Sequence, residues 1–473
     1  MEISANPWFL LQSRLVPVLW QFLQTVAQAA ADRGWNLYLV GGAVRDLYLS
    51  TLQSHALALP DLDLVVEGCP DDQSNQEWTE AAGVALAQVL LRIYPGARLD
   101  QHGRFQTAAL FWHQDPLLGS LSVDIATART EFYPYPAANP EVEASSMRQD
   151  LYRRDFTINA LAIRLTPPHP TELLDFFGGL SDLKAGFLRT LHPHSFVEDP
   201  TRIYRGVRFA VRFGFSFEPQ TLTTLREAID SGVYDRIQAE QTVTPALQTR
   251  LRSELQYLFQ TPYWKPALQQ LGSLKALSCI HRSLELTSPL WQKIRLADYC
   301  LRYLPLSSTE APLTPWLLFV EVLLAHLNPG DGYAVAIKLQ LPTESIHRLQ
   351  QLPTVQASLE QAVLVKKQLL KSQVVKLFTH YDRSTLILVA LQTHSTDLRR
   401  SIWQYLVHWR WIKAPLTGHD LKALGYQPGK EFKTILDRLL TAYLDEELTA
   451  NNEAELRDKA IVFVQHYCPP VHP

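Results

Sequence analysis

Segments typical of β-strands are confined to the first part of this chain, which has 473 residues in all. Apolar runs bounded by turn residues predict strands at residues 35–40, 62–66, 108–112, 120–126 and 160–165. Apolar residues at helical spacing predict helices at residues 16–31 and 43–49. From Ser195 to the C-terminus helical periodicity dominates. We therefore expect an α+β head with a mixed sheet and helices, followed by a long all-α remainder.

The composition is that of an ordinary globular protein, with 47% hydrophobic and 19% charged residues. A net charge of −3 argues against a protein that coats nucleic acid over its whole surface, although it permits a local basic face. The four cysteines have no metal-like spacing and favour a reducing cytoplasm. We expect no signal peptide and no membrane span, because the most apolar stretch, residues 316–327, is short and carries Glu321.

Asp61 and Asp63 lie two residues apart in a predicted strand, so their side chains leave the same face while Leu62 and Leu64 point into a core. Two close carboxylates can share oxygen ligands for divalent cations such as Mg²⁺. Asp124 lies in another predicted strand and could add a third catalytic carboxylate. The alternative for all three is an ordinary solvated or capped strand end.

Gly41 and Gly42 end a predicted strand and open a helix. Glycines at such a turn let a phosphate approach the backbone, where the helix N-terminus supplies oriented N–H groups. Arg45, one turn further on, could pair with a triphosphate. A tight strand–helix turn without any ligand would use the same glycines.

Arg153, Arg154 and Asp155 precede a predicted apolar strand. The arginines could hold phosphate and the aspartate could accept from ribose hydroxyls. The alternative is that these three residues form a surface charge cluster without a binding role.

Asp199 and Arg202 flank Pro200 at the start of a predicted helix. A carboxylate can accept from the exocyclic amine of cytosine or adenine, and a guanidinium can donate to the adjacent ring acceptor. Uracil and guanine place a carbonyl opposite the carboxylate, so such a pair could select C and A without a template. The alternative is that Asp199 is only an N-cap, with Pro200 in the first turn.

Four arginines share about a third of the circumference of this predicted helix, namely Arg202, Arg205, Arg208 and Arg212. An arginine stripe beside an apolar face suits contact with a triphosphate or an RNA backbone. Elsewhere, His419–Asp420 and the pair His192/His194 look like metal ligands, but a helix cap and a turn explain them better. Tryptophans 403, 409 and 411, interleaved with basic residues, are more typical of a core than of an RNA surface.

The motifs occur in a fixed order, LVGGAVRD, DLDLVV, VDIATARTE, RRDFTINALA and EDPTRIYRGVRF, between Leu39 and Phe209. Together they describe a site for two metals, a triphosphate, a ribose and a base. The chain resembles the class II tRNA nucleotidyltransferases (CCA-adding enzymes) and bacterial poly(A) polymerases, which have a polymerase-β-like nucleotidyltransferase head. The resemblance is dense from about residue 35 to residue 260, including residues 248–260, and returns at residues 416–440.

The resemblance implies roles for particular residues. Asp61 and Asp63 would be metal ligands for Mg²⁺, and with Asp124 they form the expected catalytic set. The expected nucleotide-binding set comprises Gly41, Gly42, Arg45, Arg154, Asp155, Asn159, Asp199, Arg202, Arg205 and Arg208. Within this set Gly42 and Arg45 would contact the triphosphate, Arg154 and Asp155 the sugar, and Asp199 with Arg202 the base.

The family pattern also implies a division into four domains and a set of substrates. We expect a catalytic head at residues 1–192, a base-recognising neck at 193–262, and a tRNA-binding body and tail at 263–370 and 371–473. ATP and CTP would be substrates, and the reaction would add all or part of the 3′-terminal CCA to tRNA by two-metal transfer without a template. The sequence carries no signal for an oligomeric state.

Alternatives remain open at two levels. The spacer at residues 50–60 is longer than usual, and the proline-rich loop at residues 130–146 looks like the branch in which separate enzymes add CC and A. An A-adding-only or CC-adding-only enzyme is therefore an alternative. A poly(A) polymerase would share every catalytic motif, but residues 467–473 are not a strongly basic tail. A non-catalytic RNA-binding relative is a third alternative, against which the intact Asp61 and Asp63 argue.

Overall fold

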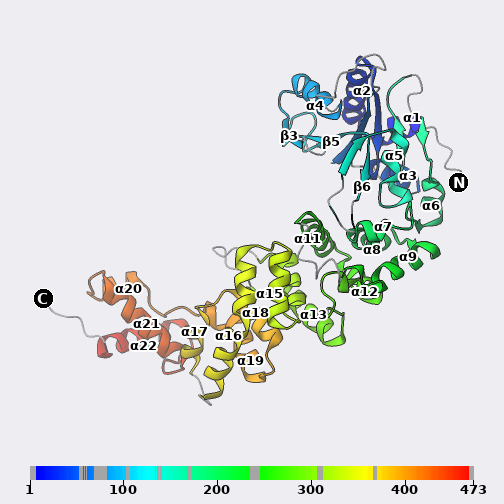
Figure 1. Ribbon diagram of the computed structural model, residues 1–473. Coiled ribbons are helices and arrows are strands. Elements are labelled where there is room, and N and C mark those ends of the chain that lie inside the picture. The colour runs from blue at the N-terminus through cyan, green and yellow to red at the C-terminus, as the bar shows by residue number, and fades with distance from the viewer. Residues whose placement is uncertain are drawn as a thin grey trace. The chain divides into compact units, whose positions relative to one another are not determined.

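The computed structural model describes residues 7–52, 57, 59, 61–68, 82–102, 107–133, 135, 138, 141–167, 172–234, 245–305, 313–365 and 370–467 (Figure 1). They form two compact units. Unit 1 comprises residues 1–254 and 262–282, and unit 2 comprises residues 255–261 and 283–473.

Unit 1 is built on a seven-stranded mixed sheet with the strand order β3-β4-β5-β2-β1-β8-β9. Its strands are β1 (Asn36–Val40), β2 (Asp61–Glu67), β3 (Arg98–His102), β4 (Thr107–Phe111), β5 (Ser122–Thr127), β8 (Ala162–Arg164) and β9 (Leu173–Leu174). β2 and β5 run parallel and every other pair in the sheet is antiparallel. Two small ribbons add β6 (Arg129–Phe132) with β7 (Glu141–Ala144), and β10 (Phe187–Leu188) with β11 (Ser216–Phe217).

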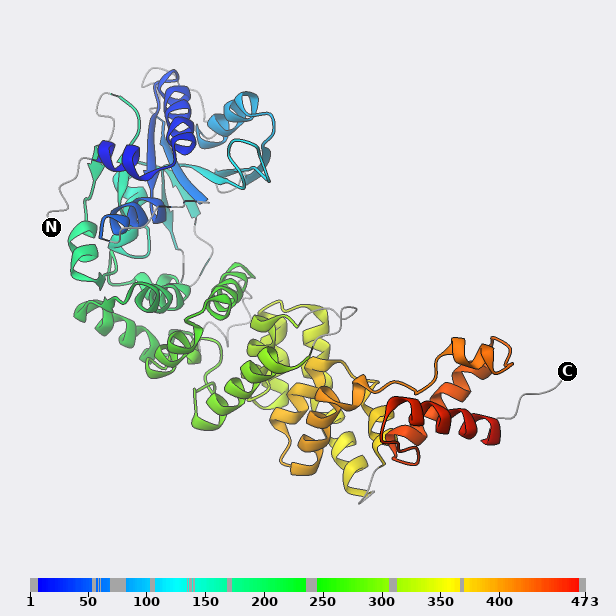
Figure 2. The same cartoon turned by 180° about the vertical axis from the view of Figure 1, so that it is seen from behind.

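Helices cover this sheet. They are α1 (Pro7–Arg14), α2 (Pro17–Ala31), α3 (Gly42–Leu52), α4 (Ala82–Ile93), α5 (Met147–Tyr152), the 3-10 turn η2 (Thr157–Asn159) and α6 (Gly179–Ala185). α2 contacts both β1 and α4, and Figure 2 shows it from the opposite side of the sheet to Figure 1. On the face that carries Val65, α5 contributes Met147 and Leu151 to a buried apolar cluster with Tyr38 and Val40.

The rest of unit 1 is almost entirely helical, with α7 (Ser195–Glu198), α8 (Thr201–Phe213), α9 (Pro219–Asp230), α11 (Pro245–Gln260), which runs on into unit 2, α12 (Trp264–Ser273) and η3 (Ala276–Cys279). α8 packs closely on the head because Gly206 has no side chain. A Cβ there would lie 2.8 Å from Phe156 and 2.7 Å from Phe217. Gly214, at a φ of 70°, ends α8 with a left-handed cap.

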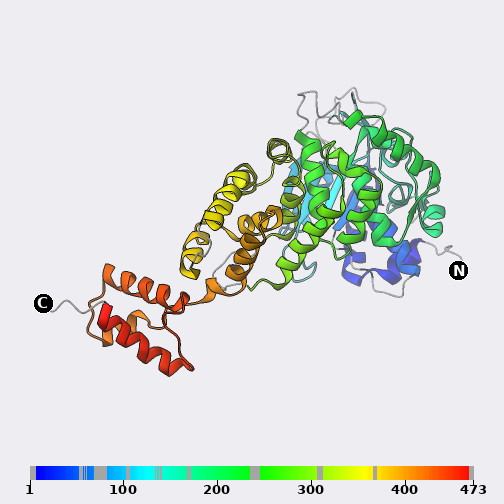
Figure 3. The same ribbon diagram turned by 90° about the horizontal axis from the view of Figure 1, so that it is seen from below.

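Unit 2 is helical throughout its described residues, apart from turns. Its elements are α13 (Ser288–Tyr303), α14 (Pro315–Leu324), α15 (Pro329–Lys338), α16 (Thr343–Val365), α17 (Lys371–Phe378), α18 (Arg383–Gln392), α19 (Thr396–Val407), η4 (Trp409–Trp411), α20 (Gly418–Ala423), α21 (Lys430–Leu444) and α22 (Glu453–Tyr467). α20, α21 and α22 share an apolar cluster centred on Leu421, Leu439 and Ala460. Figure 3 shows α21 and α22 side by side.

The fold class expected from the sequence is confirmed, with an α+β head and helices beyond it. The expected strand at residues 120–126 is β5, and the expected helix at residues 16–31 is α2, each shifted by one or two residues. Short edge strands such as β3 and β9 were not predicted, because they carry little apolar alternation. Among the described residues no helix is long and apolar enough to cross a membrane.

Some predictions concern residues outside those described. The insertion at residues 50–60 lies largely there, and so do parts of the loop at 130–146, Cys69, Cys468 and most of residues 467–473. The four-domain division stays a prediction. Unit 1 runs on to residue 282, which places α12 in the same compact unit as the head.

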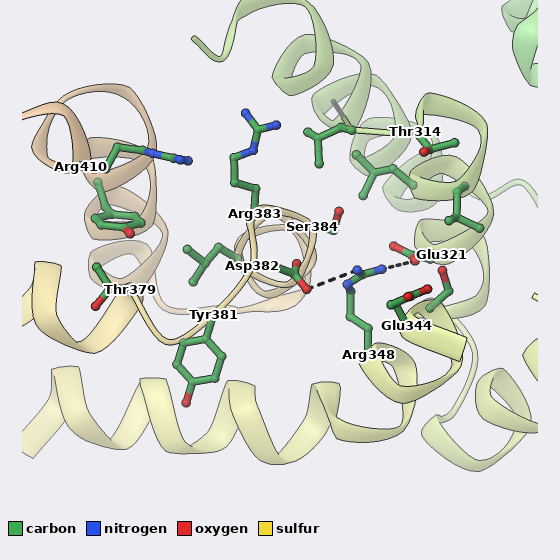
Figure 4. Close-up of a pocket in the computed structure, with 16 residues that line it drawn as sticks. Thr314, Glu321, Glu344, Arg348, Thr379, Tyr381, Asp382, Arg383, Ser384 and Arg410 are labelled. Atoms are coloured by element: carbon green, nitrogen blue, oxygen red, sulfur yellow. Dashed lines mark hydrogen bonds and ion pairs between the residues drawn. The ribbon is translucent and has the colours of Figure 1, made fainter. Parts of the chain in front are cut away.

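Unit 2 contains a buried ion pair between helices far apart in sequence. Arg348 on α16 donates to Glu321 on α14 and lies 3.3 Å from a carboxylate oxygen of Asp382, as the dashed lines of Figure 4 show. Glu321 is only 1% exposed. Burial raises the pKa of Glu321, and the charge of Arg348 opposes that rise. Arg348 therefore offsets part of the cost of keeping this buried carboxylate ionised.

We predict that Arg348→Leu lowers the free energy of unfolding by about 3–5 kcal/mol at neutral pH, because it leaves a buried carboxylate without its counter-charge. Losing Arg348 raises the folded-state pKa of Glu321 further above its unfolded value. Ionising Glu321 then lowers the free energy of unfolding as the pH rises through that pKa. The loss of stability caused by Arg348→Leu should therefore be smaller at acid pH. Urea unfolding at pH 5 and pH 8 measures both effects.

The matched control is Lys371→Leu, which removes a cation from the exposed Lys371–Glu446 pair in the same unit. An exposed pair of this kind contributes at most about 1 kcal/mol. Two results would contradict the role of Arg348 as counter-charge to the buried Glu321. One is an equal loss in free energy of unfolding for both substitutions, and the other is a loss for Arg348→Leu that does not change with pH.

Candidate active site

Three carboxylates lie on one face of the sheet of unit 1. Asp61 and Asp63 are the exposed residues of β2, alternating with the buried Leu62 and Leu64. β5 runs parallel to β2 in a register that pairs Asp63 with Asp124, which is also exposed. The expected shared face of Asp61 and Asp63 is therefore present, and Asp124 stands beside Asp63 on the neighbouring strand.

The carboxylate of Asp63 lies in a setting that disfavours its charge. Surrounding protein atoms remove part of its water and raise its pKa, the negative charge of Asp61 adds to the rise, and Arg154 opposes it. A bound cation would offset the same cost. In the described part of the chain no three histidine, cysteine or acidic side chains converge closely enough to hold a metal by themselves. A cation at this face would therefore need further oxygen ligands, as Mg²⁺ usually takes from water and phosphate.

A glycine turn borders these carboxylates. Gly41 has a φ of 66° at the junction of β1 and α3. A Cβ at Gly41 would lie 2.8 Å from Nη1 of Arg154 and 3.5 Å from Oδ2 of Asp63. The turn, the guanidinium and the metal-ligand candidate therefore meet at one point, and the positive φ of Gly41 favours glycine there.

Arg45, one turn into α3, is buried. Its Nη1 donates to Oδ1 of Asn159 at 2.6 Å, and its Nε donates to Asp46 at 2.8 Å. Its guanidinium carbon lies 5.2 Å from the ring centre of Phe209 and 4.9 Å from that of Phe213, both on α8. Arg45 thus links α3 to η2 and to α8, in addition to the triphosphate role expected from the sequence.

Asp155 is also buried, and protein donors occupy both of its oxygens. Oδ1 accepts from the backbone N–H of Phe156 at 2.8 Å and from Nδ2 of Asn159 at 2.9 Å. Oδ2 accepts from Nε of Arg205 at 2.8 Å. Burial would raise the pKa of Asp155, but the charge of Arg205 and these hydrogen bonds outweigh it and hold the pKa at about 2. Asp155 is therefore ionised and held by the protein, which favours a positioning role over direct ribose contact.

A carboxylate on α11 completes this set. Glu254 is buried and lies 3.3 Å from Arg205 and 3.3 Å from Arg208 on α8. Arg212, further along α8, lies 3.6 Å from Asp46. Three of the four arginines of the expected stripe, Arg205, Arg208 and Arg212, therefore contact acidic residues of unit 1. Sequence reasoning missed Glu254, which is the single acidic residue of α11.

The expected base-reading residues lie at the start of α8. Arg202 is buried, with Nη1 donating to the hydroxyl of Ser195 at 2.6 Å and Nη2 to the carbonyl of Arg153 at 2.8 Å. Oδ1 of Asp199 accepts from the backbone N–H and the hydroxyl of Thr201 at 3.0 and 2.6 Å. The N-cap position is occupied by Pro200, not Asp199, so the first-turn placement expected for Pro200 was one residue off. The bond from Thr201 nevertheless gives Asp199 a cap-like structural role.

Arg153 belongs to a second ionic cluster. It donates to Asp150 at 2.7 Å and to Glu131 at 2.6 Å, and Arg154 donates to Asp150 at 3.1 Å. Asp150 is fully buried, and the two arginines hold its pKa below the usual range despite that burial. The charges of the Arg153–Arg154 motif are therefore ordered by the fold. Asp150 and Glu131 were not singled out from the sequence.

The residues that only looked like metal ligands have structural partners. Asp420 forms a capping box with Thr417, the N-cap of α20, and also pairs with Arg457. His192 lies 3.3 Å from Glu198, and burial is the main cause that lowers the pKa of His192 to about 4, so it is neutral at physiological pH. Trp403 stacks on Tyr299 at 5.7 Å and is half-buried.

A cavity of about 600 Å³ lies elsewhere, in unit 2, around the Arg348–Glu321 pair (Figure 4). None of the five sequence motifs contributes a residue to it. The chemistry expected from the sequence therefore gathers on an open face of unit 1, and the size of a cavity does not identify the site in this chain.

Comparison with known proteins finds relatives of the part of the chain that carries the motifs. A family described as the poly(A) polymerase head domain matches residues 37–189. The A-adding tRNA nucleotidyltransferase of Geobacter sulfurreducens is 30% identical over 89% of this chain and 44% of its own length. That of Halalkalibacterium halodurans is 28% identical over 95% of this chain and 93% of its own. This chain thus spans about half the length of some curated relatives that it matches.

A solved structure extends the likeness to the helical region. It is described as the Thermotoga maritima CCA-adding enzyme complexed with tRNA, has a TM-score of 0.68 and 26% identity, and covers 98% of this chain and 100% of its own. The match therefore includes both compact units and the motif-bearing face of the sheet. This chain is therefore similar to tRNA nucleotidyltransferases over both compact units, and its residues 37–189 match the poly(A) polymerase head domain.

Proposed function

We propose that this chain transfers nucleotides from CTP and ATP to the 3′ end of tRNA, completing all or part of the terminal CCA without a template, in the cytoplasm that its scattered cysteines favour. The observation that carries the proposal is the meeting of Asp63, Gly41 and Arg154 at one point of the sheet face. That point combines metal ligands with a phosphate-accepting turn. A binding protein without catalysis would have no need of this combination.

The carboxylates of Asp61 and Asp63 fit divalent cations, with Mg²⁺ as the proposed ion, because they are hard oxygen donors on one exposed face. Bound there, the cations would lower the pKa of the tRNA 3′-hydroxyl and stabilise the charge on the leaving pyrophosphate. Asp124 lies next to Asp63 and would help to orient the attacking hydroxyl. This assignment makes the three carboxylates the catalytic set.

The triphosphate would lie against the turn at Gly41 and Gly42. The first N–H groups of α3 are available to an anion there, and Arg154 approaches the same turn. Arg45, Asn159 and the other arginines of α8 would shape this pocket through the buried hydrogen bonds described above. Their direct contact with nucleotide stays a prediction.

The base would be read at the start of α8. Arg202 is held by Ser195 and by the backbone of Arg153, so its position is fixed before any substrate binds. Asp199 has one oxygen engaged by Thr201, which leaves Oδ2 as the acceptor for the amine of cytosine or adenine. With Arg202 held beside it, Asp199 would favour C and A over U and G.

The tRNA would lie along the helical part of the chain. The proposed neck, body and tail, residues 193–262, 263–370 and 371–473, correspond to α7 through α22. The support is the likeness to a structure described as a tRNA complex, which covers 98% of this chain.

A second candidate is an enzyme that adds only the terminal A. Two of the similar relatives are named A-adding enzymes, and the loop at residues 130–146 has the form expected for a divided system. Purified protein can be given tRNAs ending at the discriminator base, at C and at CC, with each nucleotide separately. Incorporation of A on the CC end alone would select this candidate, and incorporation of C on the two shorter ends would exclude it.

We predict that Asp61→Asn and Asp63→Asn each lower incorporation into tRNA by at least about a hundredfold, because cation ligands act mainly on the transition state. Folding and tRNA affinity should change little, since both side chains are exposed. Single-turnover incorporation with Mg²⁺ measures the loss. Asp100→Asn, at an exposed position on edge strand β3, is the control and should retain activity. Activity within tenfold of wild type in either test variant would refute the assignment.

We predict that Asp199→Ala relaxes selection against UTP and GTP by roughly tenfold to a hundredfold, since about 1–3 kcal/mol of hydrogen bonding and repulsion is lost. Asp199→Asn separates this role from helix capping. Its carbonyl can still accept from Thr201, whereas its amide now presents a donor to the base. The kcat/KM values for four nucleotides, together with melting curves, test both variants. If Asp199→Ala is destabilised but rejects UTP and GTP as strongly as the wild type does, the base-reading role is wrong.

A further inference from the structure

One edge of the Arg250 guanidinium lacks hydrogen-bond acceptors. Arg250 lies on α11, and its Nε and Nη2 atoms are buried without a hydrogen-bond partner. These two donors are neighbours on the same edge of the planar group. Such an edge matches the two oxygens of a carboxylate, and burying it unpaired is unfavourable. The arrangement points to an acceptor that the edge meets in another state of the protein.

The nearest acidic partner of this edge is Asp199. Nε of Arg250 lies 3.8 Å from Oδ2 of Asp199, within range of an ionic interaction but beyond a hydrogen bond. The other oxygen of Asp199 is already engaged by Thr201. Arg250 therefore faces the oxygen that the proposed function assigns to the base.

Tyr133 gives a second indication that these groups share one environment. Its hydroxyl lies 3.3 Å from Glu131, to which it donates. Burial is the main cause that raises the pKa of Tyr133, and Asp199 raises it further while Arg202 and Arg250 lower it. The two arginines and the aspartate thus act on the same hydroxyl, and Arg250 is electrostatically part of the base-reading region.

We propose that Arg250 is a specificity-determining positioning residue, whose Nε–Nη2 edge closes on Asp199 when a nucleotide binds and fixes that carboxylate for reading the base. This inference rests on the proposed base-reading function of Asp199. With Thr201 on one oxygen and Arg250 on the other, the carboxylate cannot rotate. Its remaining lone pair can then accept a hydrogen bond from an amine of the base, and it repels a carbonyl oxygen. Without Arg250 the carboxylate can turn away, and a uracil or guanine carbonyl is tolerated.

A double-mutant cycle tests whether Arg250 acts through Asp199. The full chain would be assayed with a tRNA ending in CC, and the ratio of kcat/KM for ATP to that for UTP would be measured. We expect Arg250→Gln to lower this ratio on the order of tenfold. In an Asp199→Ala background the same substitution should change the ratio by less than about twofold, because its target is gone. A merely structural arginine would change total activity and leave the ratio unaltered.

Arg252→Gln is the matched control, because it removes the same charge from α11 about 200° around the helix. For Arg252→Gln the ratio of kcat/KM for ATP to that for UTP should equal the wild-type ratio. If Arg250→Gln does not fold, Arg250→Lys replaces it, since lysine keeps the charge but lacks the two-donor edge. If Asp199→Ala is inactive, the difference between the melting-temperature shifts given by ATP and UTP supplies the ratio for the four proteins.

The outcomes separate this inference from the proposed function. Equal effects of Arg250→Gln in both backgrounds, or an unchanged ratio in a folded Arg250→Gln protein, would overturn the role of Arg250 alone. A wild-type protein that incorporates no nucleotide would overturn the proposed function instead.

Discussion

The arrangement of unit 1 depends on the hydrogen bonds and the ion pair that the buried carboxylate of Asp155 makes. It accepts from Arg205 on α8, from Asn159 on η2 and from its own backbone turn, and these donors hold its pKa at about 2 despite burial. A carboxylate without such partners could not stay ionised there. The sheet-bearing head and helix α8 are therefore joined by charge as well as by the apolar contacts of Gly206.

Further contacts spread from this interaction. Asn159 also holds Arg45, and Arg205 also contacts Glu254 of α11. Three motifs that are separate in sequence, those that carry Arg45, Asp155 and Arg205, thus form one hydrogen-bonded network within unit 1. Asp63 and Gly41 lie on one side of this network, and the start of α8 lies on another. The proposed transfer needs the reacting phosphate and the base held at once, and a rigid connection of this kind would supply it.

Local sequence patterns predicted much of this arrangement. Alternation in a strand placed Asp61 and Asp63 on one face, because side-chain direction in a strand depends only on parity. Helical periodicity after Ser195 predicted the all-α remainder, because side chains three and four residues apart lie on one face of a helix. The partner of Arg205 and Arg208 was not predictable, since Glu254 is far from them in sequence and meets them only after folding. Asp150 precedes Arg153 and Arg154 by three and four residues, a helical spacing that the sequence analysis did not use. The pairing of Asp63 with Asp124 depends on strand order, which no local pattern encodes.

The most direct test of a single connected site is Asp155→Asn, assayed on tRNA ending in CC with ATP and with UTP. The substitution keeps the side-chain shape and removes the charge that holds Arg205. We expect a folded protein with tRNA affinity near that of wild type. Its rate of A incorporation should fall on the order of a hundredfold, with weaker rejection of UTP. A variant that is less stable, yet adds A at the wild-type rate and rejects UTP as strongly, would contradict the account.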